Sequence, residues 1–172
     1  MVRIDVRYEG GLHCSAVHGP SGSTLSTDAP VDNQGRGEAF SPTDLVATAL
    51  GTCMATIMGI VADRHGWNID GTSMQIAKEM TSDGPRRIQR LGVVIESPAA
   101  LDENARRTLE NAAHTCPVRL SILPAIDVPV EFRWAREKGD RSNLRERIDS
   151  STTYLEIGPF PFHPALAQCL VE

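Results

Sequence analysis

The sequence predicts an α+β domain with antiparallel sheets and one long, buried central helix. Residues 2–9 alternate between apolar and charged side chains, which is the period-2 pattern of a half-buried strand. Residues 45–62 contain no charged side chain and follow a strong helix-start signal. Strand-like alternation returns at residues 126–134. A chain of 172 residues that is 41% hydrophobic is long enough and apolar enough to bury these elements in one domain.

A meander of short strands is expected before the long helix. The alternating strand at residues 2–9 ends at Gly10 and Gly11, which favour a tight turn. Residues 12–17 are the expected hairpin partner, and residues 23–27 are a third strand. A loop rich in glycine, proline and aspartate then leads to the helix.

The long helix is predicted by its start and stop signals. Ser41 can cap the helix, Pro42 suits its first turn, and Asp44 complements the unpaired amides there. Gly66 ends the helix after His65. At 1.5 Å per residue, about 24 residues span ~36 Å, which is enough to cross the whole domain.

The surface of this helix predicts close packing against another helix. Small residues recur at every fourth position and form a flat ridge: Ala47, Gly51, Ala55 and Gly59. Because a chain of 172 residues can hardly cover such a helix on every side, the ridge predicts a homodimer. A membrane-spanning helix is not expected, since threonines and glycines dilute the uncharged stretch and aspartates close both of its ends.

The second half of the chain predicts two strands, two helices and a last strand. In chain order, they are expected at residues 68–80, 87–96, 102–114, 116–124 and 126–134. The sequence SDGP supplies the turn between the two strands. Pro117 suits a first helical turn, so Cys116 should lie at the entry of the second helix. The proline within the last strand indicates a sheet edge or a bulge.

The domain is expected to end near residue 135. Residues 1–135 carry all of the predicted elements, whereas residues 136–149 hold five basic and four acidic side chains. We therefore predict that residues 136–172 are a charged linker and a C-terminal extension of unknown role.

Charge and cysteine usage exclude several functional classes. The net charge is −5, with 17 basic and 22 acidic residues, and no Lys/Arg run is longer than two, so nucleic acid is not an expected partner. Charges alternate through the N-terminus where a secretory signal would be apolar, which predicts a cytoplasmic protein. The four cysteines form no CxxC pair and should be thiols, unless two of them share a redox role.

Two cysteines are the candidate reactive groups. Cys53 lies halfway along the apolar helix, where a cysteine is by default a small core side chain. Cys116 lies at a helix start, where free amides and the helix dipole should lower the pKa of its thiol. The two are separated by 62 residues, so they meet only if the fold brings them together. Oxidation of one thiol and resolution by the other would then be their natural chemistry.

Other uses of these side chains have weaker support. Three histidines lie near cysteines in the sequence: His13, His18 and His114. Their spacing matches no zinc motif, so no metal and no cofactor are predicted. A Cys-His hydrolase built on Cys116 is a remote alternative without a local signature. Arg36 and Glu38 lie in the loop before the long helix, where the arginine could lean toward a thiolate or both could be solvated charges.

Two segments resemble the osmotically inducible protein C and organic hydroperoxide resistance (OsmC/Ohr) family. They are SPTDLVATALGTCMA, residues 41–55, and AAHTCPV, residues 112–118, and the similarity in element order covers about residues 1–135. The resemblance implies an OsmC-like intertwined homodimer, in which two long helices pack back to back and the active sites lie at the interface.

The resemblance also implies a reaction. Cys53 would attack a hydroperoxide, become a sulfenic acid and release an alcohol, and Cys116 would capture it as a disulfide. An external dithiol, such as a lipoylated protein, would reduce that disulfide, and no bound cofactor would be used.

One position departs from the family pattern. Thr43 stands where the best peroxidases of the family have a glutamate that orients an arginine against the thiolate. Asp44 lies about 100° further around the helix and cannot simply replace that carboxylate. Arg36 is the nearest candidate for the activating arginine. The sequence therefore resembles the OsmC-like branch of the family most closely.

The first hypothesis is a homodimeric, cysteine-based peroxidase that reduces organic hydroperoxides. The alternative belongs to another class: a binding protein that uses the dimer cleft for a small apolar or thiol-reactive ligand, with little turnover. Neither hypothesis involves a membrane.

Overall fold

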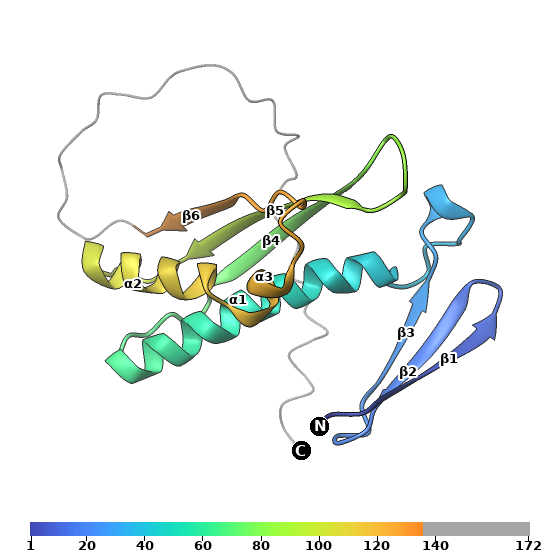
Figure 1. Ribbon diagram of the computed structural model, residues 1–172. Coiled ribbons are helices and arrows are strands. Elements are labelled where there is room, and N and C mark those ends of the chain that lie inside the picture. The colour runs from blue at the N-terminus through green and yellow to red at the C-terminus, as the bar shows by residue number, and fades with distance from the viewer. Residues whose placement is uncertain (136–172) are drawn as a thin grey trace. The chain divides into compact units, whose positions relative to one another are not determined.

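The computed structural model describes residues 1–135 (Figure 1). The predicted linker and extension, residues 136–172, lie outside the described residues. The order of strands and helices agrees with the prediction and confirms the α+β class. The strands are β1 (Ile4–Gly10), β2 (His13–His18), β3 (Thr24–Asp28), β4 (Ser73–Met80), β5 (Ile88–Ser97) and β6 (Val130–Trp134). The helices are the short 3-10 turn η1 (Val31–Asn33), α1 (Pro42–His65), α2 (Glu103–His114) and α3 (Pro117–Ser121).

The strands form two sheets, and one strand pair runs against the prediction. Strands β1, β2 and β3 make an antiparallel meander, and β4 pairs with β5 in the same manner. Strand β6 instead runs parallel to β5, with Val93 opposite Val130 and Ser97 opposite Trp134. The chain passes through α2 and α3 between these two strands, and a helical crossover of this kind returns the chain in the same direction.

Two strands are shorter than predicted, for local reasons. Residues 68–72 form a turn instead of a strand, because Asn68 Oδ1 accepts the Asp70 amide at 2.7 Å and Gly71 has a φ of 81°. Strand β6 begins only at Val130, because Pro129 has no amide to donate to the sheet. As predicted from the proline, β6 lies at a sheet edge.

Helix α1 begins and ends where its signals place it. The Asp44 amide donates to Ser41 Oγ at 3.2 Å, and the Ser41 amide donates to Asp44 Oδ2 at 2.8 Å, which completes a capping box. Gly66 closes the helix in the left-handed conformation with a φ of 70°.

The three α-helices lie on one face of the β4–β5–β6 sheet (Figure 1). Leu50, Met54 and Met58 form the inner face of α1 and are fully buried. They belong to one core cluster with Leu91 and Ile95 of β5. Truncating a buried leucine or methionine of this kind to alanine costs about 2–5 kcal/mol. This cluster holds α1 against the sheet.

The first half of the small-residue ridge faces a strand of the same chain rather than another helix. A Cβ atom added to Gly51 would lie 2.5 Å from Ile76 Cδ1, so β4 approaches the helix at the point where the sequence has glycine. Ala47 is buried as well, whereas Ala55 is exposed and Gly59 has open space around it. The first half of the ridge therefore packs within the chain.

The expectation of a wholly buried helix is not met in the single chain. Helix α1 is long and apolar enough to cross a membrane by length and composition, with a mean hydropathy of 2.0, and 33% of that stretch is buried. A core helix of a soluble protein meets the same criterion, and the buried face of α1 packs on its own sheet. Its outer face, which includes Val46 and Ile60, is exposed.

Candidate active site

Helix α1 and the start of α3 position the two cysteines that the sequence singles out. Cys53 lies in the middle of α1, on the border between its inner and outer faces, and is half-buried. Cys116 is the N-cap residue of α3 and is fully buried. Pro117 follows it at the first helical position, as the sequence predicts.

The fold brings the two thiols together. Cys53 packs against the core cluster that contains Cys116. Its side chain is close enough to the Cys116 thiol to raise the pKa of that thiol. Both are free thiols, as is the half-buried Cys14 of β2. The juxtaposition arises because α3 packs on α1, so residues far apart in the sequence share one site.

The pKa of the Cys116 thiol is opposite in direction to the prediction. Burial is the largest effect and raises the pKa above its ordinary value of 9.0, and the neighbouring Cys53 raises it further. The Arg119 amide donates to Cys116 Sγ at 3.3 Å, which acts in the lowering direction. The expected effect of the helix start is present but is outweighed, because α3 has only five residues and the sulfur has no access to water. Cys116 is therefore a neutral thiol at pH 7.

Apolar side chains surround the cysteine pair. The half-buried side chains that pack against the same cluster include Ile57 and Val61 of α1 and Val118 and Ile122 around α3. This environment excludes water and favours an apolar group beside the sulfurs.

Arg36 and Glu38 do not contact either thiol in the described chain. Arg36 Nη1 lies 3.8 Å from Glu38 Oε1, and the two side chains are 71% and 57% exposed. Cys53 is twelve residues beyond the Ser41 cap, which is about 18 Å along the helix at 1.5 Å per residue. A thiolate-activating role for Arg36 therefore stays a prediction.

A lysine of strand β4 that sequence reasoning missed contacts the start of α1. Lys78 Nζ donates to Thr43 Oγ1 at 2.8 Å and contacts Asp44 Oδ1 at 2.6 Å. Burial pushes the pKa of Asp44 upward, but hydrogen bonds from Lys78 and Ser41 outweigh it and hold the pKa below 3.8. Lys78 lies on the inward face of β4 among Met74, Ile76 and Met80, and a charged residue in an apolar stripe is the signal that could have revealed it.

The same corner of the molecule contains a cleft of about 450 Å³. It is lined by Ala39, Phe40, Asp44, Ala47, Thr48, Ile76 and Lys78. Thr43, which stands where the resemblance leads us to expect a glutamate, is uncharged. The charged pair is instead Lys78 with Asp44.

Comparison with known proteins identifies the family. A family model described as OsmC-like protein matches residues 35–131. A solved structure from Psychrobacter arcticus 273-4, assigned to the osmotic stress induced and detoxification response, is 45% identical, with a TM-score of 0.73. The match covers 77% of this chain and 96% of that chain. No curated protein matches the chain.

Two more distant structures share the fold. An organic hydroperoxide resistance protein OsmC from Legionella pneumophila is 21% identical, with a TM-score of 0.61 over 77% of this chain and 96% of that chain. The organic hydroperoxide resistance protein OhrB of Bacillus subtilis is 20% identical, with a TM-score of 0.57 over 77% and 98%. Because the family model spans more than half of the chain and a relative is 45% identical over most of it, the chain belongs to the OsmC-like protein family.

Proposed function

We propose that the protein is a dithiol hydroperoxide reductase in which Cys53 attacks and Cys116 resolves. The observation that carries the proposal is the meeting of these two free thiols inside an apolar site, although 62 residues separate them in the sequence. Membership of a family whose structural neighbours include organic hydroperoxide resistance proteins supports the same reaction.

The reaction balances with one hydroperoxide and one external dithiol. Cys53 Sγ attacks the outer oxygen of the peroxide, the O–O bond breaks, and the alcohol leaves with a proton. The resulting sulfenic acid on Cys53 is attacked by Cys116 Sγ, and water leaves as the disulfide forms. A dithiol such as a lipoylated protein then supplies two electrons and two protons and restores both thiols.

The environments of the two sulfurs favour this assignment of roles. The attacking sulfur must be accessible to the peroxide, and Cys53 is the half-buried member of the pair. Cys116 is fully buried, and its raised pKa keeps it protonated until the sulfenic acid forms beside it. The apolar surroundings favour a hydroperoxide with an organic group, at about 25 cal/mol per Å² of apolar surface buried.

We also propose that two copies of the chain form a homodimer. Alternate residues of β1 form an apolar stripe that is largely exposed, with Ile4 at 61%, Val6 at 67% and Tyr8 at 64%. Such a stripe indicates a surface that a partner covers. We propose that a second copy of the chain covers this stripe. The exposed face of α1 is a further apolar surface that the same partner could cover.

The threonines on the outer face of α1 are suited to such burial. The Oγ1 atoms of Thr48, Thr52 and Thr56 each donate to the carbonyl oxygen four residues earlier, at 2.8–2.9 Å. Because these hydroxyl donors are already satisfied, a partner could cover them with little desolvation cost.

Light scattering on a size-exclusion column tests the dimer. Val6→Glu places a charge in the exposed stripe and should shift the protein toward the monomer. Arg7→Glu changes the other face of the same strand and is the matched control. A wild-type monomer at micromolar concentration would contradict the proposal.

A coupled assay tests the reaction. Cumene hydroperoxide should be consumed catalytically when dihydrolipoamide is present, and Cys53→Ser should abolish turnover. Cys14→Ser is the control, because this half-buried thiol lies in strand β2 and has no proposed role. Oxidation of the wild type by one equivalent without turnover would favour a binding protein and contradict a reductase.

A further inference from the structure

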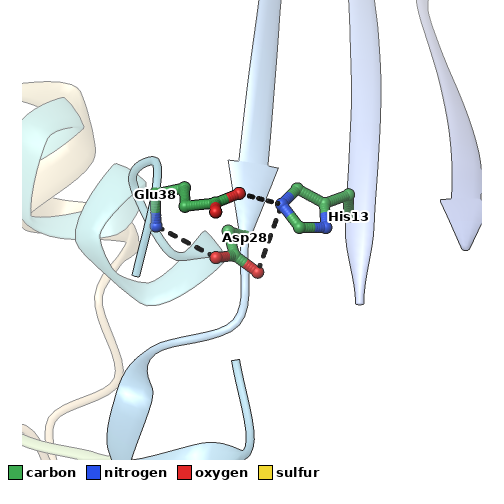
Figure 2. A group of neighbouring side chains, drawn as sticks. All are labelled: His13, Asp28 and Glu38. Carbon is green, nitrogen blue, oxygen red and sulfur yellow. Dashed lines mark hydrogen bonds and ion pairs between the residues drawn. The ribbon is translucent and has the colours of Figure 1, made fainter. Parts of the chain in front are cut away.

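We propose that His13, Asp28 and Glu38 form a binding site for a divalent transition-metal ion such as Zn²⁺. Figure 2 shows the three side chains converging from strand β2, the end of strand β3 and the loop before α1. One ligand atom from each residue lies within 4.8 Å of the others. The proposal is independent of the thiol chemistry, because no ligand comes from α1 or α3.

The distances between the ligand atoms also fit a bound metal ion. His13 Nε2 lies 3.3 Å from Glu38 Oε2 and 3.6 Å from Asp28 Oδ1. A charge-assisted hydrogen bond would bring these atoms to about 2.7–2.9 Å. In a tetrahedral site with bonds of about 2.1 Å, neighbouring ligand atoms are ~3.4 Å apart, which agrees with both separations.

A buried oxygen that accepts no hydrogen bond in the described residues points into the cluster. Asp28 is 1% exposed, and within residues 1–135 no group donates a hydrogen bond to its Oδ1 atom. Its other oxygen, Oδ2, accepts the amides of Arg36 at 3.1 Å and Glu38 at 3.0 Å. A buried anionic oxygen of this kind calls for a cation.

The histidine is oriented as a metal ligand would be. His13 Nδ1 lies 2.9 Å from the carbonyl oxygen of Gly11, which can only accept a hydrogen bond, so Nδ1 carries the proton. Nε2 is then the nitrogen that faces the two carboxylates and would bind the ion. Metal-binding histidines typically donate their second nitrogen to a backbone carbonyl in this manner.

The loop that carries Glu38 is fixed by its own backbone. Gly35 lies against Ala29 so closely that any side chain would collide, and the Gly35 amide donates to the Pro30 carbonyl at 3.1 Å. Arg36 contacts Glu38 Oε1, which leaves Oε2 for the site. Neutral imidazole with two carboxylates is a donor set that Zn²⁺, Mn²⁺ and Fe²⁺ accept, and the ion would tie the loop to the sheet.

Titration of the full-length, reduced protein with Co²⁺ and with Zn²⁺ tests the site. We expect one ion per chain and the visible d–d absorption of Co²⁺ without the near-ultraviolet band of a cobalt–thiolate bond. His13→Gln and Glu38→Gln should each weaken Zn²⁺ binding by at least about tenfold, measured by calorimetry. His18→Gln, at the opposite end of the same strand, is the matched control and should bind as the wild type does.

The choice of variants separates a lost ligand from a lost fold. Glu38 is 57% exposed and accepts no backbone hydrogen bond in the described residues, so Glu38→Gln should fold as the wild type does, which circular dichroism checks. Failure of the wild type to bind either ion at millimolar concentration would overturn the proposal. Undiminished binding by both His13→Gln and Glu38→Gln, or a cobalt–thiolate band as the sole signal, would overturn it as well.

Discussion

Replacing Gly51 with alanine should force the end of the Ile76 side chain of β4 to move away from helix α1, two residues before Cys53. The new Cβ atom would meet Ile76 Cδ1 at 2.5 Å and Cγ1 at 3.3 Å. Overpacking of a core costs about 1–3 kcal/mol, whereas alanine gains about 1 kcal/mol over glycine in a helix interior. The net effect of Gly51→Ala should therefore be a loss of about 0–2 kcal/mol in the free energy of unfolding.

A double-mutant cycle isolates the collision from the helix propensity. Ile76→Val removes Cδ1 and by itself costs about 0.5–1.5 kcal/mol. In that background Gly51→Ala should become stabilising, so the coupling energy should be about 1–3 kcal/mol in urea denaturation. The rate of disulfide formation should fall in Gly51→Ala and recover in the double variant. Equal effects of Gly51→Ala in both backgrounds would refute the idea that the approach of β4 requires glycine.

Three further predictions concern the charged groups and the substrate. Lys78→Met should make the free energy of unfolding less sensitive to acid, because Lys78 helps to lower the pKa of the Asp44 carboxyl. A carboxylate with a lowered pKa stabilises the fold above its unfolded pKa, and this contribution is lost as the pH falls through the folded pKa. The lost contribution should be at most about 1 kcal/mol after solvent screening, read from urea midpoints at pH 6 and 3.5. Arg36→Ala should slow the first oxidation step without lowering the melting temperature, and an unchanged rate would make Arg36 a solvated loop charge. The kcat/KM for cumene hydroperoxide should exceed that for hydrogen peroxide; the reverse order would exclude an apolar substrate site.

Local signals predicted the local structure well. The capping box at Ser41 and the left-handed Gly66 fix both ends of α1, because each depends on a few neighbouring residues. The Cys116–Pro117 pair fixes the start of α3 in the same way. The family resemblance supplied what local patterns could not, namely that Cys53 and Cys116 share one site.

Features that depend on distant residues were missed or predicted incorrectly. The parallel direction of β6 follows from the crossover through α2 and α3, which strand alternation cannot reveal. The raised pKa of Cys116 follows from burial by α1, and the sequence shows only the helix start that would lower it. Gly51 was predicted to face another helix, as part of the small-residue ridge of α1, but it faces Ile76 of β4. In each case tertiary packing determines the property.

Tertiary packing also explains why the sequence did not predict the two clusters of polar side chains. Lys78 reaches Thr43 and Asp44 across 34 residues of sequence or more, and no spacing rule joins a strand lysine to a helix start. His13 comes from β2, and its carboxylate neighbours lie in a separate strand and a loop. Such sites become visible only when the backbone is folded.

The division of roles between Cys53 and Cys116 is tested most directly by intact-protein mass spectrometry after one and then excess equivalents of cumene hydroperoxide. The wild type should lose two hydrogens, and the disulfide should map to Cys53 and Cys116. Cys116→Ser should gain one oxygen and then a second, because the sulfenic acid on Cys53 has no thiol to capture it. Cys53→Ser should keep its mass at one equivalent, because the buried Cys116 is protonated. If Cys53→Ser gains the oxygens and Cys116→Ser does not, the two roles are reversed and the account is wrong.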